Sequence, residues 1–375
     1  MSKKITFLIT SKAFRSGVIN DTVNNNTELV LGEEVNYKTK DILLGSGKSL
    51  PFSKSNYFDI LKEIAGHPNK YEVSYICMVS KEWMRDFCAG REIGEKYILK
   101  NFRMVYSSSI QSIKEILTKS NLVIVRGNYR EWNEALKFIH SDYIFLPCNA
   151  RICPKNLKIN IDKKKCHIFV DDHEIAKKFS QLNYKSYIFK KPAMSLFYEN
   201  SSNAKKDIDL ILICSKTDRM HKRVDLFIDS LIYLDKITNV KLNAVIVGDS
   251  SFHKNKIKSL KLNMISLSAA NNGKRTGKLE IMKLLDRSKV KVCTSSIDAN
   301  PRVISESLAR DVPVLCAKDL MGGKFQINKK TGAFFEPNAK DLSAKILETL
   351  HNLETFSPRD NCNKIEDAAM QILNL

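Results

Sequence analysis

Two acidic residues in the last third of the chain stand eight positions apart, in a segment that reads DANPRVISE from Asp298 to Glu306. An apolar run precedes the segment and a run of helical periodicity follows it, which predicts a strand, a tight loop and a helix start. We expect Asn300 to be the N-cap and Pro301 the first helical residue. The amides of Arg302 and Val303 would then be unpaired donors of the first turn, which form a phosphate site.

Both carboxylates of this segment can face one ligand. Glu306 lies one turn into the predicted helix, and its side chain tilts back toward the helix start, while Asp298 lies on the strand side. The alternative is an ordinary strand–helix connection, in which Arg302 and Glu306 form a surface ion pair and Asp298 is a turn residue. Other features of the sequence are needed to choose between a ligand site and an ordinary connection.

The elements that would position these groups alternate between strand and helix in both halves of the chain. Pro192 and the run NSSNAKKD separate the halves. We predict an α/β protein with two Rossmann-like, doubly wound domains at 1–190 and 208–355, a linker at 191–207, and a C-terminal helix within 356–375 that packs back on the first domain. The predicted strands are Lys4–Thr10, Leu29–Leu31, Tyr71–Ser80, Leu122–Arg126, Tyr143–Pro147, Asp209–Cys214, Leu242–Val247, 289–294 and 312–316, and the predicted helices are Val224–Leu234, 278–288, 302–310 and Lys364–Leu373.

Composition limits the classes of function. The 375 residues, 43% of them hydrophobic, suffice for two cores, and the net charge of +20 favours anionic partners. The lysine clusters lack interleaved aromatic residues and a nucleic-acid module, so we predict a solvated surface first, an anionic membrane surface second, and no nucleic-acid partner. Apolar windows are too short for a membrane span or signal peptide, which predicts a cytoplasmic protein, peripheral at a membrane. The clusters are 163–165, 177–178, 190–191 and 254–258.

Other potential sites are weaker. The nine cysteines are scattered, with none in a CxxC pair, so we expect reduced thiols. The pair Asp207 and Asp209 precedes a strand and is more typical of a solvated boundary than of a metal site, so no metal is predicted. Gly45–Ser49 ends like a phosphate-binding loop, but Ile42 stands where that loop needs glycine and Pro51 follows, so we expect a flexible loop.

The paired-acid segment resembles the signature of glycosyltransferase family 4, the glycosyl transferases group 1. In that signature seven residues separate two acidic ones, and a helix and a Val-Pro-Val strand follow; here it reads D-ANPRVIS-E-SLARDVPVLCA. Four further blocks agree in chain order, and the resemblance covers residues 205 to about 350. It implies a GT-B fold, in which two Rossmann-like domains face a cleft, and a hexosyltransferase that transfers with retention. The further blocks are SKTDRMHKRVDLFIDSL, NAVIVGD, LEIMKLLDRSKVKVCTSS and MGGKFQINKKTGAFFEP.

The resemblance also implies roles for individual residues. Glu306 would bind the ribose hydroxyls, and Asp298 would be the catalytic-site acid that holds the hydroxyls of the donor sugar. The amides of Arg302 and Val303 would bind the diphosphate, with Lys222 as its countercharge. The family's arginine partner has three candidates, and the alternative for some of them is a solvated basic face. These candidates are Arg219, Lys216 and Arg223.

Glycines close several predicted strands and loops. Gly248 follows the predicted strand 242–247, where a base or ribose can approach the backbone closely, but a plain left-handed turn would also require glycine. Gly322 and Gly323 carry the same two alternatives.

Transfer by such an enzyme would need no metal and no cofactor. The donor implied is a UDP- or GDP-linked sugar and the acceptor a glycan or a lipid-linked molecule. As the nucleoside diphosphate departs, fixed N–H groups and cations at the phosphates lower the barrier. The alternative is a noncatalytic nucleotide-sugar-binding protein of the same fold. The short side chain of Asp298, and the loss of the family's histidine and glycine pair in the first half of the chain, would suit that alternative.

The first half of the chain should hold the acceptor, and there the family's Gly-Gly pair and histidine are replaced by ITSKAFRSG and LVIVRGNYREW. Gly17 and Arg126 lie at the ends of predicted strands and are the acceptor-side candidates. For Arg126, a loop with a surface arginine is the alternative. We expect Asp171, Asp172 and His173 to be capping and polar residues rather than catalysts.

Overall fold

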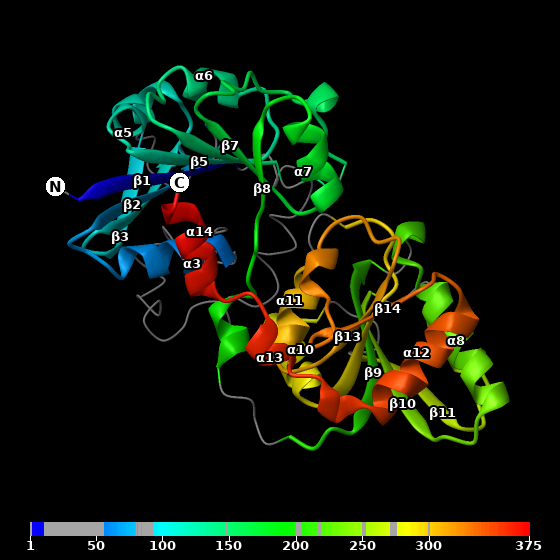
Figure 1. The fold of residues 1–375 in the computed structure, drawn as a ribbon. Coiled ribbons are helices and arrows are strands. Elements are labelled where there is room, and N and C mark those ends of the chain that lie inside the picture. Colours follow the sequence, from blue (N-terminus) through cyan, green and yellow to red (C-terminus); the bar gives the residue numbers. More distant parts are fainter. Residues whose placement is uncertain are drawn as a thin grey trace. The chain divides into compact units, whose positions relative to one another are not determined.

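The computed structural model describes residues 2–10, 56–79, 81, 84, 93–147, 149, 151–199, 204–216, 219–249, 253–270, 276–298 and 301–375. Its contacts divide the chain into two units (Figure 1). Unit 1 contains residues 1–190 and 365–375, and unit 2 contains residues 191–364. The chain therefore leaves unit 1 after β8 and returns to it for its last helix.

Unit 1 is built on an eight-stranded sheet of order β3-β4-β2-β1-β5-β6-β7-β8. All neighbouring strands are parallel except β3 and β4, which form an antiparallel hairpin at one edge. The strands are β1 (Lys3–Thr10), β2 (Tyr71–Met78), β3 (Ile93–Leu99), β4 (Phe102–Ser107), β5 (Leu122–Arg126), β6 (Tyr143–Leu146), β7 (Cys166–Val170) and β8 (Lys185–Ile188).

Helices cover both faces of this sheet because successive strand residues point to opposite sides. Ile5 and Phe7 of β1 pack on one face with α3 (Asn56–Ala65) and α14 (Ile365–Leu373), which contact each other. Leu8 packs on the other face. Gln371 ties α14 to the end of β8, since its Oε1 accepts from the amide of Lys190 at 3.0 Å. The elements of the second face are η3 (Gln111–Ile113), α5 (Lys114–Thr118), α6 (Trp132–Leu136), η4 (Pro154–Asn156) and α7 (His173–Ser180).

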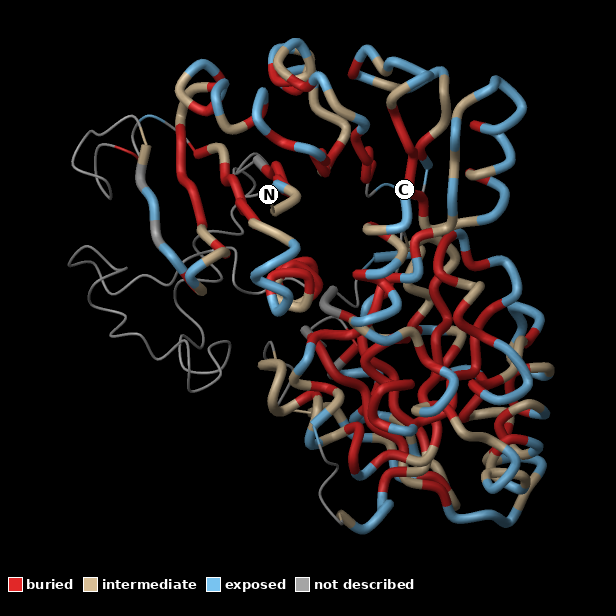
Figure 2. The backbone as a smooth tube through the Cα atoms, turned by 60° about the vertical axis from the view of Figure 1, so that its left-hand side comes forward, coloured by how far each residue is buried: buried red, intermediate tan, exposed pale blue. Residues whose placement is uncertain are grey.

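Unit 2 contains a six-stranded, fully parallel sheet of order β11-β10-β9-β12-β13-β14. Its strands form the buried interior of the unit (Figure 2). The strands are β9 (Ile208–Lys216), β10 (Leu242–Asp249), β11 (Ile265–Ala269), β12 (Ser288–Cys293), β13 (Val314–Ala317) and β14 (Gly332–Phe335).

The helices of unit 2 also lie on both faces of their sheet. One apolar cluster joins the sheet to α8, α9 and α12, and the other joins it to η5, α10, α11 and α13. The segment 191–199, predicted as a linker, contributes Phe197 to the core of unit 2. The elements are η5 (Ser195–Tyr198), η6 (Met220–Lys222), α8 (Val224–Ile237), α9 (Lys254–Ser259), α10 (Lys278–Asp286), α11 (Arg302–Ala309), η8 (Lys324–Gln326), α12 (Ala339–His351), η9 (Leu353–Thr355) and α13 (Pro358–Asn361).

These sheets confirm the predicted doubly wound α/β architecture. Some predicted ends were wrong: the strand predicted at Tyr71–Ser80 ends at Met78, and the helix predicted at 278–288 ends at Asp286, because Ser288 already belongs to β12. The predicted strand Leu29–Leu31 and the loop Gly45–Ser49 lie outside the described residues. No disulfide joins the described cysteines. No helix in the described part of the chain is long and apolar enough to span a bilayer.

Candidate functional site

The order of the strands in unit 2 points to one end of its sheet. From β9 the chain first adds β10 and β11 on one side and then β12, β13 and β14 on the other. Helices therefore leave β9 and β12 toward opposite faces. The carboxyl ends of these two strands are the switch point of the sheet, called the crevice below because open α/β sheets bind ligands there. The loops that follow β9 and β12 are where a ligand is expected.

Hydrogen bonds join these two loops. The hydroxyl of Thr294, just after β12, donates to the carbonyl of Lys222 at 2.6 Å. The amide of Ser296 donates to the carbonyl of His221 at 2.9 Å. Arg223, the next residue, has φ +47, a left-handed conformation that is strained for a residue with a side chain. The short helix η6 is thus held against the loop that contains Asp298.

Asp298 and Lys222 meet in this crevice, although 76 residues separate them in the sequence. The ammonium of Lys222 donates to Oδ2 of Asp298 at 2.8 Å, and the two side chains are 15% and 27% exposed. The amide of Asp298 donates to the carbonyl of Met321 at 3.0 Å. A cation and a carboxylate are therefore presented side by side and remain accessible to a ligand.

Helix α11 begins at Arg302, as the predicted range 302–310 has it, but its N-cap differs by one residue from the prediction. Pro301 is extended, with ψ 101, so it is the N-cap rather than the first helical residue, and α11 begins at Arg302. The amide of Ile304 donates back to the carbonyl of Pro301 at 2.8 Å. No hydrogen bond joins the amides of Arg302 or Val303 to a described residue. Two donors at the positive end of the helix dipole thus remain for an anion.

Glu306 is the most buried acid of the site, with a side chain only 1% exposed. Its Oε1 accepts a hydrogen bond from the ammonium of Lys278, the first residue of α10. Among the described residues its Oε2 has no hydrogen-bond partner. A buried acceptor with no donor is costly, so this oxygen is suited to a ligand hydroxyl. The alternative interpretation, a surface ion pair between Arg302 and Glu306, is therefore wrong.

Sequence patterns did not identify Lys278. One local signal was available: a lysine in the first turn of a predicted helix opposes the helix dipole unless an anion lies beside it. The anion, Glu306, is 28 residues away on the next helix. Only the packing of α10 and α11 reveals the pair.

Glycines allow close approach around the site. Gly248 lies within β10, with φ +136, where the pairing with β9 shifts register, so the strand does not stop before it as predicted. Gly322 and Gly323 have φ +91 and +76. A Cβ on Gly323 would lie 2.8 Å from Cδ of Pro301, so glycine lets this loop reach the start of α11.

The other residues predicted from the sequence lie at strand ends, at helix caps or outside the described residues. Arg219 is an exposed N-cap of η6, and Lys216 ends β9, the strand that enters the crevice. Arg126 ends β5 in unit 1, with its guanidinium 5.0 Å from the ring centre of Tyr57. Gly17 lies outside the described residues. Asp172 caps α7 as predicted, since its Oδ1 accepts from the amide of Glu174 at 2.9 Å.

Asp207 and Asp209 each form an ion pair with a basic side chain. Arg287 donates to both oxygens of Asp207 at 2.8 and 2.6 Å, and this contact lowers the carboxyl's pKa. Lys289 donates to Asp209 at 2.7 Å. Both acids therefore take part in structural ion pairs at the start of β9.

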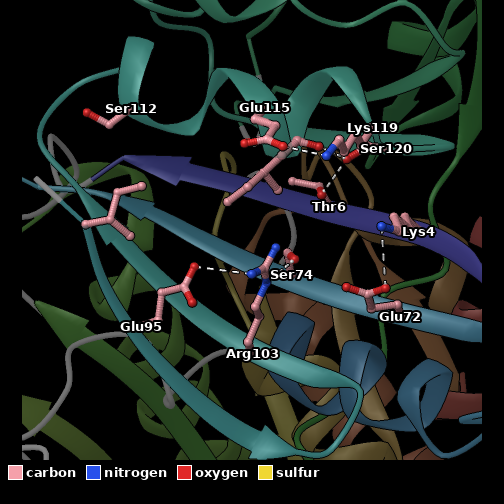
Figure 3. Close-up of a pocket in the computed structure, with 12 residues that line it drawn as sticks. Lys4, Thr6, Glu72, Ser74, Glu95, Arg103, Ser112, Glu115, Lys119 and Ser120 are labelled. Atoms are coloured by element: carbon pink, nitrogen blue, oxygen red, sulfur yellow. Dashed lines mark hydrogen bonds and ion pairs between the residues drawn. The ribbon is translucent and has the colours of Figure 1, made fainter.

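Unit 1 contains a polar cavity of about 380 Å³ at the amino ends of its strands, shown in Figure 3. Arg103 donates to Ser74 and Glu95 at 3.0 and 3.2 Å, and Lys4 lies 3.8 Å from Glu72. Lys119 pairs with Glu115. Each cation in the wall has an acidic partner, and parallel sheets bind ligands at their carboxyl ends, so this cavity does not resemble the crevice of unit 2.

Two doubly wound α/β units, each with helices on both faces of its sheet, match the architecture of the GT-B class of proteins. Residues 198–368 match the family model of glycosyl transferases group 1. This part of the chain is thus similar to the glycosyl transferases group 1 family, and the chain has a GT-B fold, as its sequence predicts.

Solved structures share this fold at low identity. Sucrose-phosphate synthase from Thermosynechococcus elongatus has 12% identity and a TM-score of 0.58, and the match covers 99% of this chain and 98% of that one. HepE from Anabaena, solved with UDP and glucose, has 13% identity, a TM-score of 0.58 and the same coverage. A putative UDP-N-acetylglucosamine 2-epimerase from Listeria monocytogenes has 11% identity and a TM-score of 0.57, and the match covers 100% and 95% of the two chains. No curated protein sequence matches the chain. One fold thus carries different chemistries, and function must be argued from the site.

Proposed function

We propose that the protein transfers a sugar from a nucleoside-diphosphate sugar to an acceptor hydroxyl, with the nucleotide held by unit 2. The observation that carries the proposal is the set of groups at the ends of β9 and β12. This set has two amides with no described partner, a cation beside a carboxylate, and a buried carboxylate oxygen to which no described residue donates. A sugar nucleotide offers the complementary groups, which are phosphate oxygens, sugar hydroxyls and ribose hydroxyls.

In this proposal each residue meets one part of the donor. The amides of Arg302 and Val303 bind phosphate oxygens, Lys222 supplies a positive charge, and Glu306 accepts from the ribose. Asp298 accepts from hydroxyls of the transferred sugar. The ion pair between Lys222 and Asp298 holds both groups at the crevice until the donor brings each of them a partner of its own.

The chemical step forms one bond and breaks one. The acceptor oxygen bonds to the anomeric carbon while the bond from that carbon to the diphosphate oxygen breaks, and the acceptor proton passes to a phosphate oxygen. Negative charge grows on the leaving diphosphate, so prearranged N–H groups and Lys222 stabilise the transition state more than the ground state. We propose that the transfer proceeds with retention, on the same face of the sugar that the diphosphate leaves.

The donor class and the metal requirement belong to the same proposal. UDP- and GDP-linked hexoses are the proposed donors, and a glycan or lipid-linked hydroxyl is the proposed acceptor. The amides and Lys222 supply the charge stabilisation at the diphosphate, so we expect transfer to persist in the presence of EDTA. The lysines of the clusters 163–164 and 177–178 are exposed on unit 1, and their attraction to an anionic membrane stays a prediction.

Nucleotide release and product formation with a panel of UDP- and GDP-sugars test this function. Asp298→Asn should lower turnover by about ten- to a hundredfold, because a hydrogen bond to a charged group is lost, while the Kd of the nucleotide stays within about threefold. The matched control is Asp229→Asn on α8, an exposed acid that should leave both values unchanged.

The results separate the alternatives. Saturable nucleotide binding without turnover on any donor would support a noncatalytic nucleotide-sugar-binding protein. Conversion of the donor sugar to its epimer, with no transfer, would indicate different chemistry on this fold. No binding of any nucleoside diphosphate would overturn the proposal as a whole.

A further inference from the structure

Lys278 has an unusual place for a lysine. It is the first residue of α10, and its N-cap is Gly277, which has no side chain to cap the helix. The partial positive charge of a helix start disfavours a cation there, and acidic residues are the usual choice. Such a position needs a compensating interaction.

Glu306 supplies that interaction and is itself dependent on it. The carboxylate is almost completely buried, whereas Lys278 is 25% exposed, so the lysine lies between the acid and solvent. The ammonium also lies 5.6 Å from the ring centre of Phe197, which is fully buried. A buried carboxylate without a cation is strongly unfavourable. Lys278 is the cation bound to Glu306 in the described structure.

The two oxygens of Glu306 are not equivalent. Lys278 occupies Oε1, and Oε2 has no partner among the described residues. A carboxylate held at one oxygen loses the freedom to turn, so the direction of the other oxygen is set before a ligand arrives. A fixed acceptor discriminates between a ligand that has the matching hydroxyl and one that lacks it, because the unmatched acceptor stays buried without a donor.

We propose that Lys278 is a positioning residue that makes the site selective for nucleotides with intact ribose hydroxyls. By binding Oε1 of Glu306 it fixes the orientation of the carboxylate and directs Oε2 to a ribose hydroxyl. This inference rests on the proposed function, since it assumes that the crevice of unit 2 binds a nucleoside diphosphate. It adds the residue that orients Glu306 and so sets how strongly the site prefers a ribonucleotide over a deoxyribonucleotide.

The test compares the Kd of UDP with those of 2′-deoxy-UDP and 3′-deoxy-UDP by calorimetry, or uses the GDP series if the unmodified protein binds GDP instead. Proteins to compare are the unmodified chain, Lys278→Met, Lys278→Gln, Lys278→Arg and the control Lys283→Met. Lys283 is an exposed lysine on the same helix. Melting temperatures show that each variant is folded, and Lys278→Gln keeps the test open if Lys278→Met does not fold.

We expect the unmodified chain to prefer the ribonucleotide over at least one deoxy form by about tenfold or more. Lys278→Met should weaken ribonucleotide binding about tenfold and leave deoxynucleotide binding nearly unchanged, so that the preference falls to about twofold. Lys278→Arg should restore most of the preference, and Lys283→Met should behave like the unmodified chain.

Other outcomes would overturn the inference in distinguishable ways. Equal weakening of ribo- and deoxynucleotide binding in Lys278→Met would show that the lysine only supports the fold. An unmodified chain that binds nucleotides without preferring the ribose form would refute the role of Glu306 but not nucleotide binding. An unmodified chain that binds no nucleoside diphosphate would refute the proposed function itself.

Discussion

Helices α10 and α11 are joined by two ion pairs of opposite polarity. At the start of α10, Lys278 binds Glu306 of α11. At the end of α10, Asp286 binds Arg310, which follows the last residue of α11. The acids of both pairs and Arg310 are at most 3% exposed, so charge and burial alone do not distinguish the pairs.

Their hydrogen bonds do distinguish them. Nε and Nη2 of Arg310 lie 2.6 Å from one oxygen of Asp286, and Nη1 donates to the carbonyl of Glu199 at 2.7 Å. The guanidinium therefore joins α10, α11 and the segment after η5 into one core. The pair of Glu306 and Lys278 instead leaves Oε2 without a described partner and the lysine partly exposed. Nη2 of Arg310 also has no described hydrogen bond, but it lies 2.6 Å from its counterion. The comparison indicates that a buried acceptor without a described partner, rather than a buried charge, identifies a ligand site.

The largest expected effect is on the Asp286–Arg310 pair. Arg310→Met removes the 2.6 Å ion pair of the buried Asp286 and should lower the free energy of unfolding by about 3–5 kcal/mol. Urea denaturation of the transition that includes unit 2 measures the loss. At urea concentrations too low to unfold the variant, its nucleotide Kd should stay within about threefold of the unmodified value, because Arg310 lies away from the ligand end of α11.

A double variant sharpens this prediction. Asp286→Leu combined with Arg310→Met removes both charges, and it should recover most of the lost stability because two buried charges are replaced by apolar groups. A double variant as unstable as Arg310→Met alone would mean that the bond from Arg310 to the carbonyl of Glu199, rather than the ion pair, stabilises this region.

Glu306→Gln should show the opposite behaviour. The substitution keeps the side-chain volume but removes the negative charge, so the nucleotide Kd should rise about ten- to a hundredfold, which corresponds to a loss of about 1.5–3 kcal/mol. The free energy of unfolding should change by no more than about 1 kcal/mol, since Lys278 can turn to solvent. Unchanged nucleotide affinity in this variant would remove the distinction between the two ion pairs.

The sequence predicts the local parts of this arrangement. The alternation of apolar runs predicts the parallel sheets, and the loop–helix pattern around Asp298 places the amides of Arg302 and Val303 at a helix start. It does not predict partners that packing brings together, such as Lys278 with Glu306 or Asp286 with Arg310, because periodicity reports which face of a helix is apolar but not which helix lies against it.

Element boundaries and edge strands were also harder to predict. Asn300 is a common N-cap type and Pro301 a common first residue, yet the extended ψ of Pro301 moves the helix start to Arg302. The hairpin β3–β4 at the sheet edge was missed because the strand IGEKYIL carries exposed charged and polar residues that weaken the apolar pattern. The side-chain amide of Asn101, in the turn of this hairpin, donates to the carbonyls of Ala65 and Tyr71 at 2.8 Å. Both partners lie at least 30 positions away in the sequence, so a local pattern does not reveal them.

The smallest expected effect is that of Gly323→Ala on nucleotide binding. It tests whether backbone strain at the start of α11 weakens binding while strain elsewhere in unit 2 does not. Alanine at φ +76 costs about 1–2 kcal/mol, and its Cβ would push against Pro301, which precedes the open amides of α11. Gly323→Ala should therefore raise the nucleotide Kd about three- to tenfold.

Gly332→Ala is the matched control, because its Cβ would lie 2.0 Å from the carbonyl oxygen of Val314, away from the crevice. It should lower the melting temperature more than Gly323→Ala and leave the nucleotide Kd of the folded protein unchanged. If both variants weakened nucleotide binding equally, the start of α11 would not be the part of unit 2 that binds the phosphates.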